Sequence, residues 1–141
     1  MKASIRWAGQ ARFDGQSGSG HTVVMDGPPD HGGTNQGPRP MEMLLLGLGA
    51  CTSFDVMHIL GKSRAEVTDC VAEIEAERAD AIPAVFTRIG IRFVVSGRNL
   101  NRTVVERAVR LSAEKYCSAS IMLEKGGVQI HHSVEVREIG P

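Results

Sequence analysis

Two cysteines set within helix-like segments are the residues of this chain with the clearest chemical potential. Cys51 lies in a long apolar run, and Cys117 closes the segment 112–117. The two do not form a local CxxC pair, and the cysteine pattern does not indicate a secreted disulfide framework. A thiol in a buried helix, with a second thiol far away in sequence, is typical of a nucleophile and its resolving partner. Such a pair performs two-electron redox chemistry without a cofactor.

A structural role is the alternative for each cysteine, because cysteine is among the most buried residue types. Cys70 lies in phase with the apolar residues Ala72 and Ile74, so core packing is the favoured interpretation there. The Met, Leu and Gly neighbours of Cys51 also suit a core position, and Cys117 fits the end of a buried helix. The pattern alone therefore leaves both roles open for these two thiols.

Thiolate chemistry at Cys51 requires a nearby positive charge. Cys51 lies about 15 Å into its predicted helix, at roughly 1.5 Å per residue, where the helix dipole has faded. Apolar burial would raise the thiol pKa, so a cation must come from elsewhere, and arginine keeps its charge when partly desolvated. The sequence offers Arg12 in the first hairpin and Arg39 just before the helix. Asp55, one helical turn after Cys51, could hold such an arginine in place.

Two histidines could also carry chemistry. His58 lies one further turn along the same predicted helix and could act as a base or a ligand, although a structural role is favoured. His132 shares the apolar face of the last predicted strand, where a buried and hydrogen-bonded histidine is the commoner outcome. Cys51, Cys117 and His132 do not have the spacing of metal ligands, so no metal site is expected.

Composition narrows the class of protein. The chain has 141 residues, with 16 basic and 16 acidic side chains, 42% apolar residues and 4% aromatic residues. One domain, 1–141, is expected at this length. Zero net charge argues against nucleic acid or an anionic membrane surface as a partner. The segment 43–54 is the longest apolar stretch without charge and is shorter than the ~20 residues of a membrane span. Without an apolar leader, the protein is expected to be cytoplasmic.

The elements that must position these residues follow from hydrophobic periodicity. Short strands are predicted at 2–8, 11–14 and 21–26, followed by a Gly- and Pro-rich loop, 27–40. Pro40 begins a helix that runs to about Leu60 and is apolar almost all round, so it must be buried on most sides. The remaining elements are strands at 66–78, 86–96 and 128–138, and a helix from the cap Asn101 to Cys117. This order predicts an α+β fold with an antiparallel sheet, and an intertwined homodimer would bury the apolar helix.

Two motifs resemble the OsmC/Ohr family of thiol-dependent hydroperoxide reductases: GPRPMEMLLLGLGACTSFDV at 37–56 and SAEKYCS at 112–118. The 66-residue separation of the cysteines is also similar. The loop GGTNQGP at 32–38 and the strand start FTRI at 86–89 resemble the YhfA-like branch of that family. The resemblance implies an OsmC-like fold, in which antiparallel sheets wrap around a long buried central helix from each chain of an intertwined homodimer, with active sites at the interface.

The resemblance also implies roles for particular residues. Cys51 would be the peroxidatic thiol, which attacks the O–O bond of an organic hydroperoxide and becomes a sulfenic acid. Cys117 would be the resolving thiol, and a dithiol, lipoylated or of low molecular weight, would reduce the resulting disulfide. Arg12, in GQARFDG at 9–15, resembles the arginine motif of the family. The family places a glutamate ten residues before the peroxidatic cysteine; here that position is Met41, and Glu42 lies nine residues before Cys51.

Three hypotheses of function follow. The first is a peroxidase for organic hydroperoxides, with fatty-acyl or aryl substrates suiting an apolar pocket. The second is a binding or redox-sensing dimer without peroxidase activity, which Met41 at the glutamate position favours. The third is other thiol chemistry of Cys51 on an electrophilic metabolite. Only the first requires Cys117 as a resolving thiol.

Overall fold

The computed structural model describes residues 1–140, which form two compact units. The first unit consists of Met1–Leu46, and the second begins at Gly47. Each unit has a three-stranded sheet, and helices complete the predicted α+β composition. The expectation of a single domain over 1–141 stays a prediction.

The first unit is built on a small antiparallel sheet with the order β1-β2-β3. Its strands are β1 (Ala3–Trp7), β2 (Phe13–Ser17) and β3 (Thr22–Met25). Three short strands were expected here, but the second lies at 13–17 instead of 11–14. Gly15 is the reason, because this centre of β2 pairs with Ile5 on one side and Val23 on the other. Pairing on both edges overrides the weak strand propensity of glycine.

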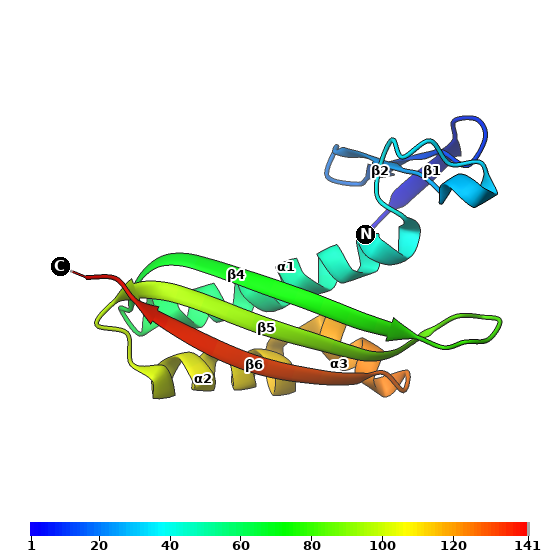
Figure 1. Ribbon diagram of the computed structural model, residues 1–141. Coiled ribbons are helices and arrows are strands. Elements are labelled where there is room, and N and C mark those ends of the chain that lie inside the picture. The colour runs from blue at the N-terminus through cyan, green and yellow to red at the C-terminus, as the bar shows by residue number, and fades with distance from the viewer. Residues whose placement is uncertain (141) are drawn as a thin grey trace. The chain divides into compact units, whose positions relative to one another are not determined.

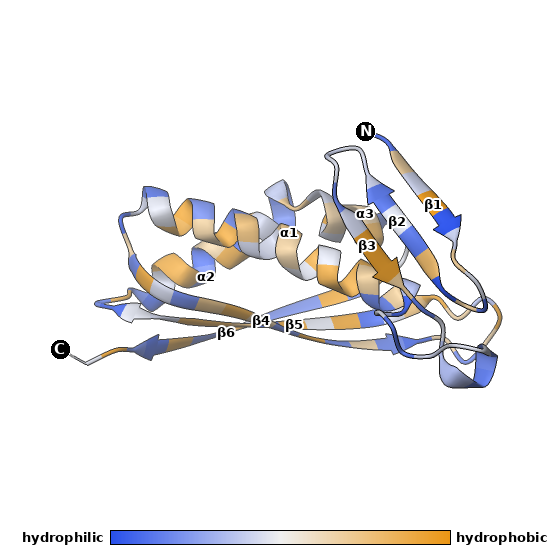
Figure 2. Ribbon diagram, turned by 90° about the horizontal axis from the view of Figure 1, so that it is seen from above, coloured by the Kyte–Doolittle hydropathy of each residue, from blue (hydrophilic) through white to orange (hydrophobic). Residues whose placement is uncertain are grey.

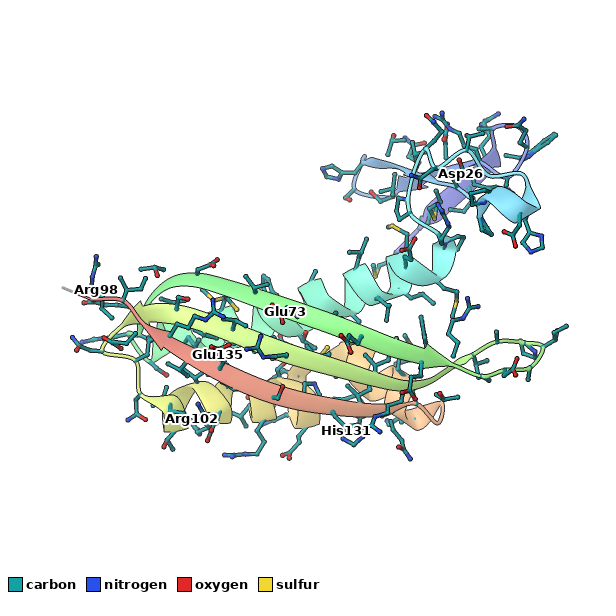
Figure 3. The ribbon with its side chains drawn as sticks, viewed as in Figure 1. Asp26, Glu73, Arg98, Arg102, His131 and Glu135 are labelled. Atoms are coloured by element: carbon teal, nitrogen blue, oxygen red, sulfur yellow. The ribbon has the colours of Figure 1, made fainter. Side chains whose placement is uncertain are left out.

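A buried carboxylate organises the loop that follows β3. Asp26 is 1% exposed, and its side chain accepts hydrogen bonds from the backbone N–H groups of Gly27, Thr34 and Gln36 at 2.9–3.1 Å and from the hydroxyl of Thr34. These bonds, that of Gln36 foremost, hold the pKa of Asp26 below its ordinary value. Figure 3 labels Asp26 within this loop, which includes the short helix η1 (Pro29–His31). One side chain therefore fixes the course of the predicted loop 27–40.

Helix α1 (Pro40–Lys62) matches the predicted helix to within two residues. Its buried positions, which lie along one face, are Leu48, Gly49, Thr52, Val56 and Leu60. Other large apolar side chains of α1 are exposed, and Phe54 is 73% exposed. The chain alone therefore buries one face of a helix that the sequence predicts to be buried on most sides. Within residues 1–140, α1 is the one helix long and apolar enough to cross a membrane, a property shared by core helices of soluble proteins.

The second unit has three strands with the order β4-β5-β6. These are β4 (Glu66–Arg78), β5 (Phe86–Arg98) and β6 (Gln129–Glu138). Three helical segments connect β5 to β6, namely α2 (Arg102–Leu111), the π-helical turn η2 (Ser112–Tyr116) and α3 (Ser118–Lys125). The part of α1 in this unit lies with α2 and α3 on one face of the sheet (Figures 1 and 2).

The core of the second unit lies between this face and the helices. The predicted inward row of β5, which contains Ile89, Ile91, Phe93 and Val95, is at most 1% exposed. The opposite face of the sheet is charged: Arg92 forms ion pairs with Glu73 and with Glu135, so one guanidinium connects all three strands. Figure 3 labels the two glutamates. Two-sided patterning of this kind fixes the register of the sheet.

Two further details differ from the sequence-based prediction. Strand β6 pairs with β5 in parallel, whereas an antiparallel sheet was expected. The connection through α2 and α3 explains the parallel pairing, because it carries the chain back across the sheet before β6 begins. The helix expected to run from Asn101 to Cys117 instead ends at Leu111, and Cys117 lies between η2 and α3. Asn101 caps α2 as predicted, accepting from the N–H of Thr103.

Candidate active site

The two cysteines that are 66 residues apart in sequence meet in the second unit. The distance between Cys51 Sγ on α1 and Cys117 Sγ is 3.4 Å, and both thiols are free. Cys51 is half-buried, whereas Cys117 has no exposed surface. We refer to Cys51 and Cys117 as the thiol pair. A redox disulfide requires two sulfurs this close together. The fold thus brings together the two cysteines that the sequence indicated as a nucleophile and its resolving partner.

The π-helical turn places Cys117. The N–H of Cys117 donates to the carbonyl of Ser112 at 2.8 Å, five residues earlier, where a regular α-helix would use Ala113. Cys117 then leaves the helix with extended backbone angles and becomes the N-cap residue of α3. Its sulfur accepts a hydrogen bond from the N–H of Ser120 at 3.4 Å. The wider turn and the new helix start together fix the position of this side chain.

Close packing places Cys51. A Cβ on Gly49 would lie 2.7 Å from Ile74 Cδ1, so α1 approaches β4 closely at this point. Thr52 is fully buried, and its hydroxyl donates back to the carbonyls of Leu48 and Gly49 at 3.1 Å. Glycine has a low helix propensity, but at position 49 it gives α1 room to pack against the sheet without displacing the Ile74 side chain.

Burial makes the two sulfurs unequal. Burial raises the pKa of the Cys117 thiol above its ordinary value; hydrogen bonds from Ser120 oppose the increase, and the neighbouring sulfur of Cys51 adds to it. Cys117 therefore remains a neutral thiol at neutral pH. Since Cys51 is also the more accessible sulfur, a dissolved oxidant reaches Cys51 first.

Asp55 has a partner other than the arginine expected from the sequence. Its Oδ2 atom accepts a hydrogen bond from the hydroxyl of Ser112 at 3.2 Å, and within residues 1–140 it forms no ion pair. The carboxylate therefore connects α1 to the start of η2. Asp55 is one of the residues that line a cavity of about 440 Å³, together with His58, Ile59, Lys62, Ser63, Arg107, Leu111 and Tyr116.

The other predicted site residues lie in the first unit and have partners there. Arg12 donates to Asp14 Oδ1 at 3.1 Å. Arg39 donates to the Asn35 side chain and the Gly37 carbonyl, both at 3.2 Å. Glu42 accepts from the N–H of Arg39 at 2.8 Å and so caps the first turn of α1. Their roles toward Cys51 stay predictions.

The remaining candidates have structural surroundings. His58 stacks against Phe54, with ring centroids 6.3 Å apart. His132 stacks against Phe93, but its buried Nε2 atom has no hydrogen-bond partner, so the expectation of a hydrogen-bonded histidine is wrong for this atom. Cys70 is half-buried on β4, and burial raises the pKa of its thiol. Within residues 1–140, no three His, Cys, Asp or Glu side chains are arranged to hold a metal ion.

Two serines at the thiol pair were missed by the sequence analysis. Ser112 begins η2 and contacts α1, and Ser120 donates its N–H to Cys117. Serine is unremarkable in a helical segment, and neither position carries a periodic signal. A cap search that allowed a thiol as the acceptor at Cys117 would have pointed to Ser120.

The chain is similar to known proteins in sequence and in fold. Residues 33–133 match the family described as OsmC-like protein. The chain is 46% identical over 136 residues to Protein YhfA of Escherichia coli K12, covering 96% of this chain and 98% of that protein. A hypothetical protein from Aquifex aeolicus VF5 has a similar structure, with 29% identity, a TM-score of 0.86, and coverage of 99% of this chain and 97% of that chain.

An organic hydroperoxide resistance protein OsmC from Legionella pneumophila has a TM-score of 0.71 at 19% identity, with 96% of each chain covered, which shows a shared fold. The predicted OsmC-like α+β fold and the predicted family are both confirmed. The chain therefore belongs to the OsmC-like protein family.

Proposed function

We propose that this protein reduces organic hydroperoxides to alcohols through a Cys51 thiolate, with Cys117 as the resolving thiol. The observation that carries the proposal is the 3.4 Å distance between the two free sulfurs. Family membership and neighbours with the same fold support a redox or peroxide-related role. Organic hydroperoxide resistance is part of the name of OhrB of Bacillus subtilis, which is 20% identical with a TM-score of 0.62, so the specific activity rests on the thiol geometry.

The proposed cycle has three balanced steps. The Cys51 thiolate attacks the terminal oxygen of ROOH, the O–O bond breaks, and RO⁻ takes a proton to leave as the alcohol, which produces Cys51–SOH. The Cys117 thiol then attacks the sulfenic sulfur, forming the disulfide and releasing water. A dithiol, lipoylated or of low molecular weight, reduces this disulfide to two thiols and becomes a disulfide itself.

Exposure supports this assignment of roles. Cys117 has no exposed surface, and burial raises its pKa, so it is a poor first nucleophile. Cys51 is the sulfur that a peroxide reaches from solvent. The same difference makes Cys51 the sulfur that an incoming reductant attacks, with Cys117 as the leaving thiolate.

The wider setting belongs to the same proposal. An intertwined homodimer would cover the exposed apolar residues of α1, among them Phe54 at 73% exposure and Met57 at 39%. Arg12 and Glu42 are the proposed pair that activates the Cys51 thiol. The proposed location of the protein is the cytoplasm. Fatty-acyl or aryl hydroperoxides are the proposed substrates.

Variants of the three cysteines test the proposal. Turnover of cumene hydroperoxide with dihydrolipoamide should be abolished in Cys51→Ser and reduced to at most a single turnover in Cys117→Ser. Cys70→Ser is the matched control and should retain nearly full activity, because Cys70 lies on β4 and has no role in the proposed cycle. Normal peroxide consumption by Cys51→Ser would refute the mechanism. Full multiple turnover by Cys117→Ser would instead favour other thiol chemistry at Cys51.

A redox-sensing or binding dimer is the second candidate. The observation that favours it is the use of Glu42 as a helix cap, together with Met41 at the family glutamate position and the pairing of Arg12 with Asp14. In that case the thiol pair forms a disulfide with disulfide oxidants but reacts with hydroperoxides no faster than a free thiol. Stopped-flow measurement of the Cys51 reaction with cumene hydroperoxide separates the two candidates.

A further inference from the structure

A buried serine connects the two segments that carry the thiol pair. Ser112 is 1% exposed, and its hydroxyl lies 3.3 Å from the carbonyl of Thr52 and 3.2 Å from Asp55 Oδ2. Thr52 is the residue directly after Cys51, and Asp55 lies one turn further along α1. The hydroxyl has one proton, so it donates to one of these two α1 acceptors at a time.

The same residue also holds the backbone of the other cysteine. The carbonyl of Ser112 accepts the N–H of Cys117 at 2.8 Å, which is the bond that closes the π-helical turn. A chain of contacts therefore runs from Cys51 through Thr52 to Ser112, on to Cys117, and back to Cys51 across the 3.4 Å between the sulfurs. Apart from the cysteines themselves, Ser112 is the residue of this ring that bonds both to α1 and to Cys117.

We infer that Ser112, with Asp55 as its acceptor, positions Cys117 for disulfide formation with Cys51. We call Ser112, Asp55 and the Thr52 carbonyl the Ser112 clamp. The inference deepens the proposed function, because it names the residue that sets the approach of the resolving thiol. A π-helical turn is a rare, local departure from α-helix geometry, so contacts with neighbouring elements are needed to hold it. The clamp restricts η2 to the arrangement in which the thiols are in contact.

Positioning of this kind has a thermodynamic signature. The clamp and the disulfide both hold η2 against α1, so each should strengthen the other, and the coupling is reciprocal. Removal of the Ser112 hydroxyl should therefore cost more stability in the disulfide form than in the dithiol form. A residue with a purely structural role would cost the same in both forms and leave the redox equilibrium unchanged.

The test is the equilibrium of the purified full-length protein with glutathione. One oxidised glutathione and the two protein thiols exchange to give the protein disulfide and two reduced glutathiones, so the reaction needs no hydroperoxide. Ser112→Ala should lower this equilibrium constant by roughly three- to tenfold, which is the size of the coupling expected between groups in direct contact, because only the extra strength of the hydrogen bond in the disulfide form shifts the equilibrium. Ser118→Ala is the matched control: Ser118 is an exposed serine on the other side of Cys117 and should leave the constant unchanged.

Two further variants address the acceptor and protect the test against misfolding. Asp55→Asn retains an oxygen that accepts the hydroxyl and should stay within about twofold of the wild type. Asp55→Ala leaves only the Thr52 carbonyl and should shift the constant in the same direction as Ser112→Ala, by a smaller factor. Equal constants for the wild type, Ser112→Ala and Asp55→Ala would overturn the clamp. That result would leave the peroxidase proposal intact, because the peroxidase proposal fails only in the hydroperoxide assay.

Discussion

Oxidation of the thiol pair should stabilise the protein by an amount that the structure predicts. A Cys51–Cys117 disulfide closes a loop of 66 residues, and chain entropy gives about 4 kcal/mol for a loop of that size. The sulfurs must approach from 3.4 Å to about 2.05 Å, and the strain of this movement offsets part of the gain. The net stabilisation should therefore be about 2–4 kcal/mol. For a domain of this size, that corresponds to an increase in Tm of roughly 6–12 °C.

Calorimetry of the oxidised and reduced forms measures this difference. The protein is prepared in a Cys70→Ser background, so that Cys51 and Cys117 are the only thiols that can pair, and both forms are scanned at one protein concentration. Cys117→Ser in the same background is the control, and oxidant should leave its Tm unchanged. A disulfide form that unfolds at a lower temperature than the dithiol form would refute the reasoning, because it would mean that the folded backbone opposes the bond.

Three further predictions concern packing and pH. Gly61→Ala should stabilise the protein by about 1 kcal/mol, since its Cβ would meet nothing within 4 Å. Gly49→Leu should destabilise it by about 1–3 kcal/mol through the contact with Ile74. Urea unfolding in which both variants changed the free energy of unfolding in the same direction would contradict this packing. His132→Leu should raise stability at pH 7 by about 1 kcal/mol by removing an unpaired buried nitrogen. Burial and the nearby His131 lower the pKa of His132, so the wild type should lose stability as the pH falls below about 6.5. The stability advantage of His132→Leu should therefore be larger at pH 5 than at pH 7. A variant that is less stable than the wild type at both pH values would contradict this account. The pKa of Asp26 is also lowered, so its contribution is present above about pH 4 and is lost as the pH falls through the folded-state pKa. Asp26→Asn should be less stable than the wild type at pH 7, and urea unfolding should show the difference shrinking as the solution becomes more acidic; a difference that stayed constant or grew would contradict this role.

Elements with a strong hydrophobic pattern were predictable from the sequence. The alternation of β4 is visible in its exposed glutamates, and the inward row of β5 is visible in its isoleucines and valines. Helix α1 was recognisable from Pro40 and the apolar run that follows it. In each case the local preference and the buried face agree, so the pattern and the packing give the same answer.

The direction of β6 and the path through Cys117 were not predictable from periodicity. Alternation indicates which face of a strand is buried but not whether its neighbour runs parallel to it. The length of the connection between β5 and β6 was the available signal, because a parallel pair requires a long crossover. Helix α3 has eight residues and begins at a cysteine cap, which lies outside the usual serine, threonine and aspartate signals.

The candidate site was predictable in its residue types but not in its positioning. Cys51 and Cys117 stood out as thiols, and their contact depends on a single π-helical turn that no sequence period marks. Ser112 acquires its importance only once that turn brings it against Thr52 and Asp55. The departure from regular helix geometry lies where the proposed chemistry occurs, as is common for π-turns.

The most direct test of the proposed thiol cycle is the mass and free-thiol count of the intact protein after one equivalent of cumene hydroperoxide. The protein is first reduced and desalted, and peptide mapping then locates any disulfide. The proposal predicts rapid loss of two thiols, a decrease in mass of about 2 Da from the two lost hydrogens, a disulfide that maps to Cys51 and Cys117, and full reversal by a dithiol. Thiols that remain unchanged in an excess of hydroperoxide would contradict it.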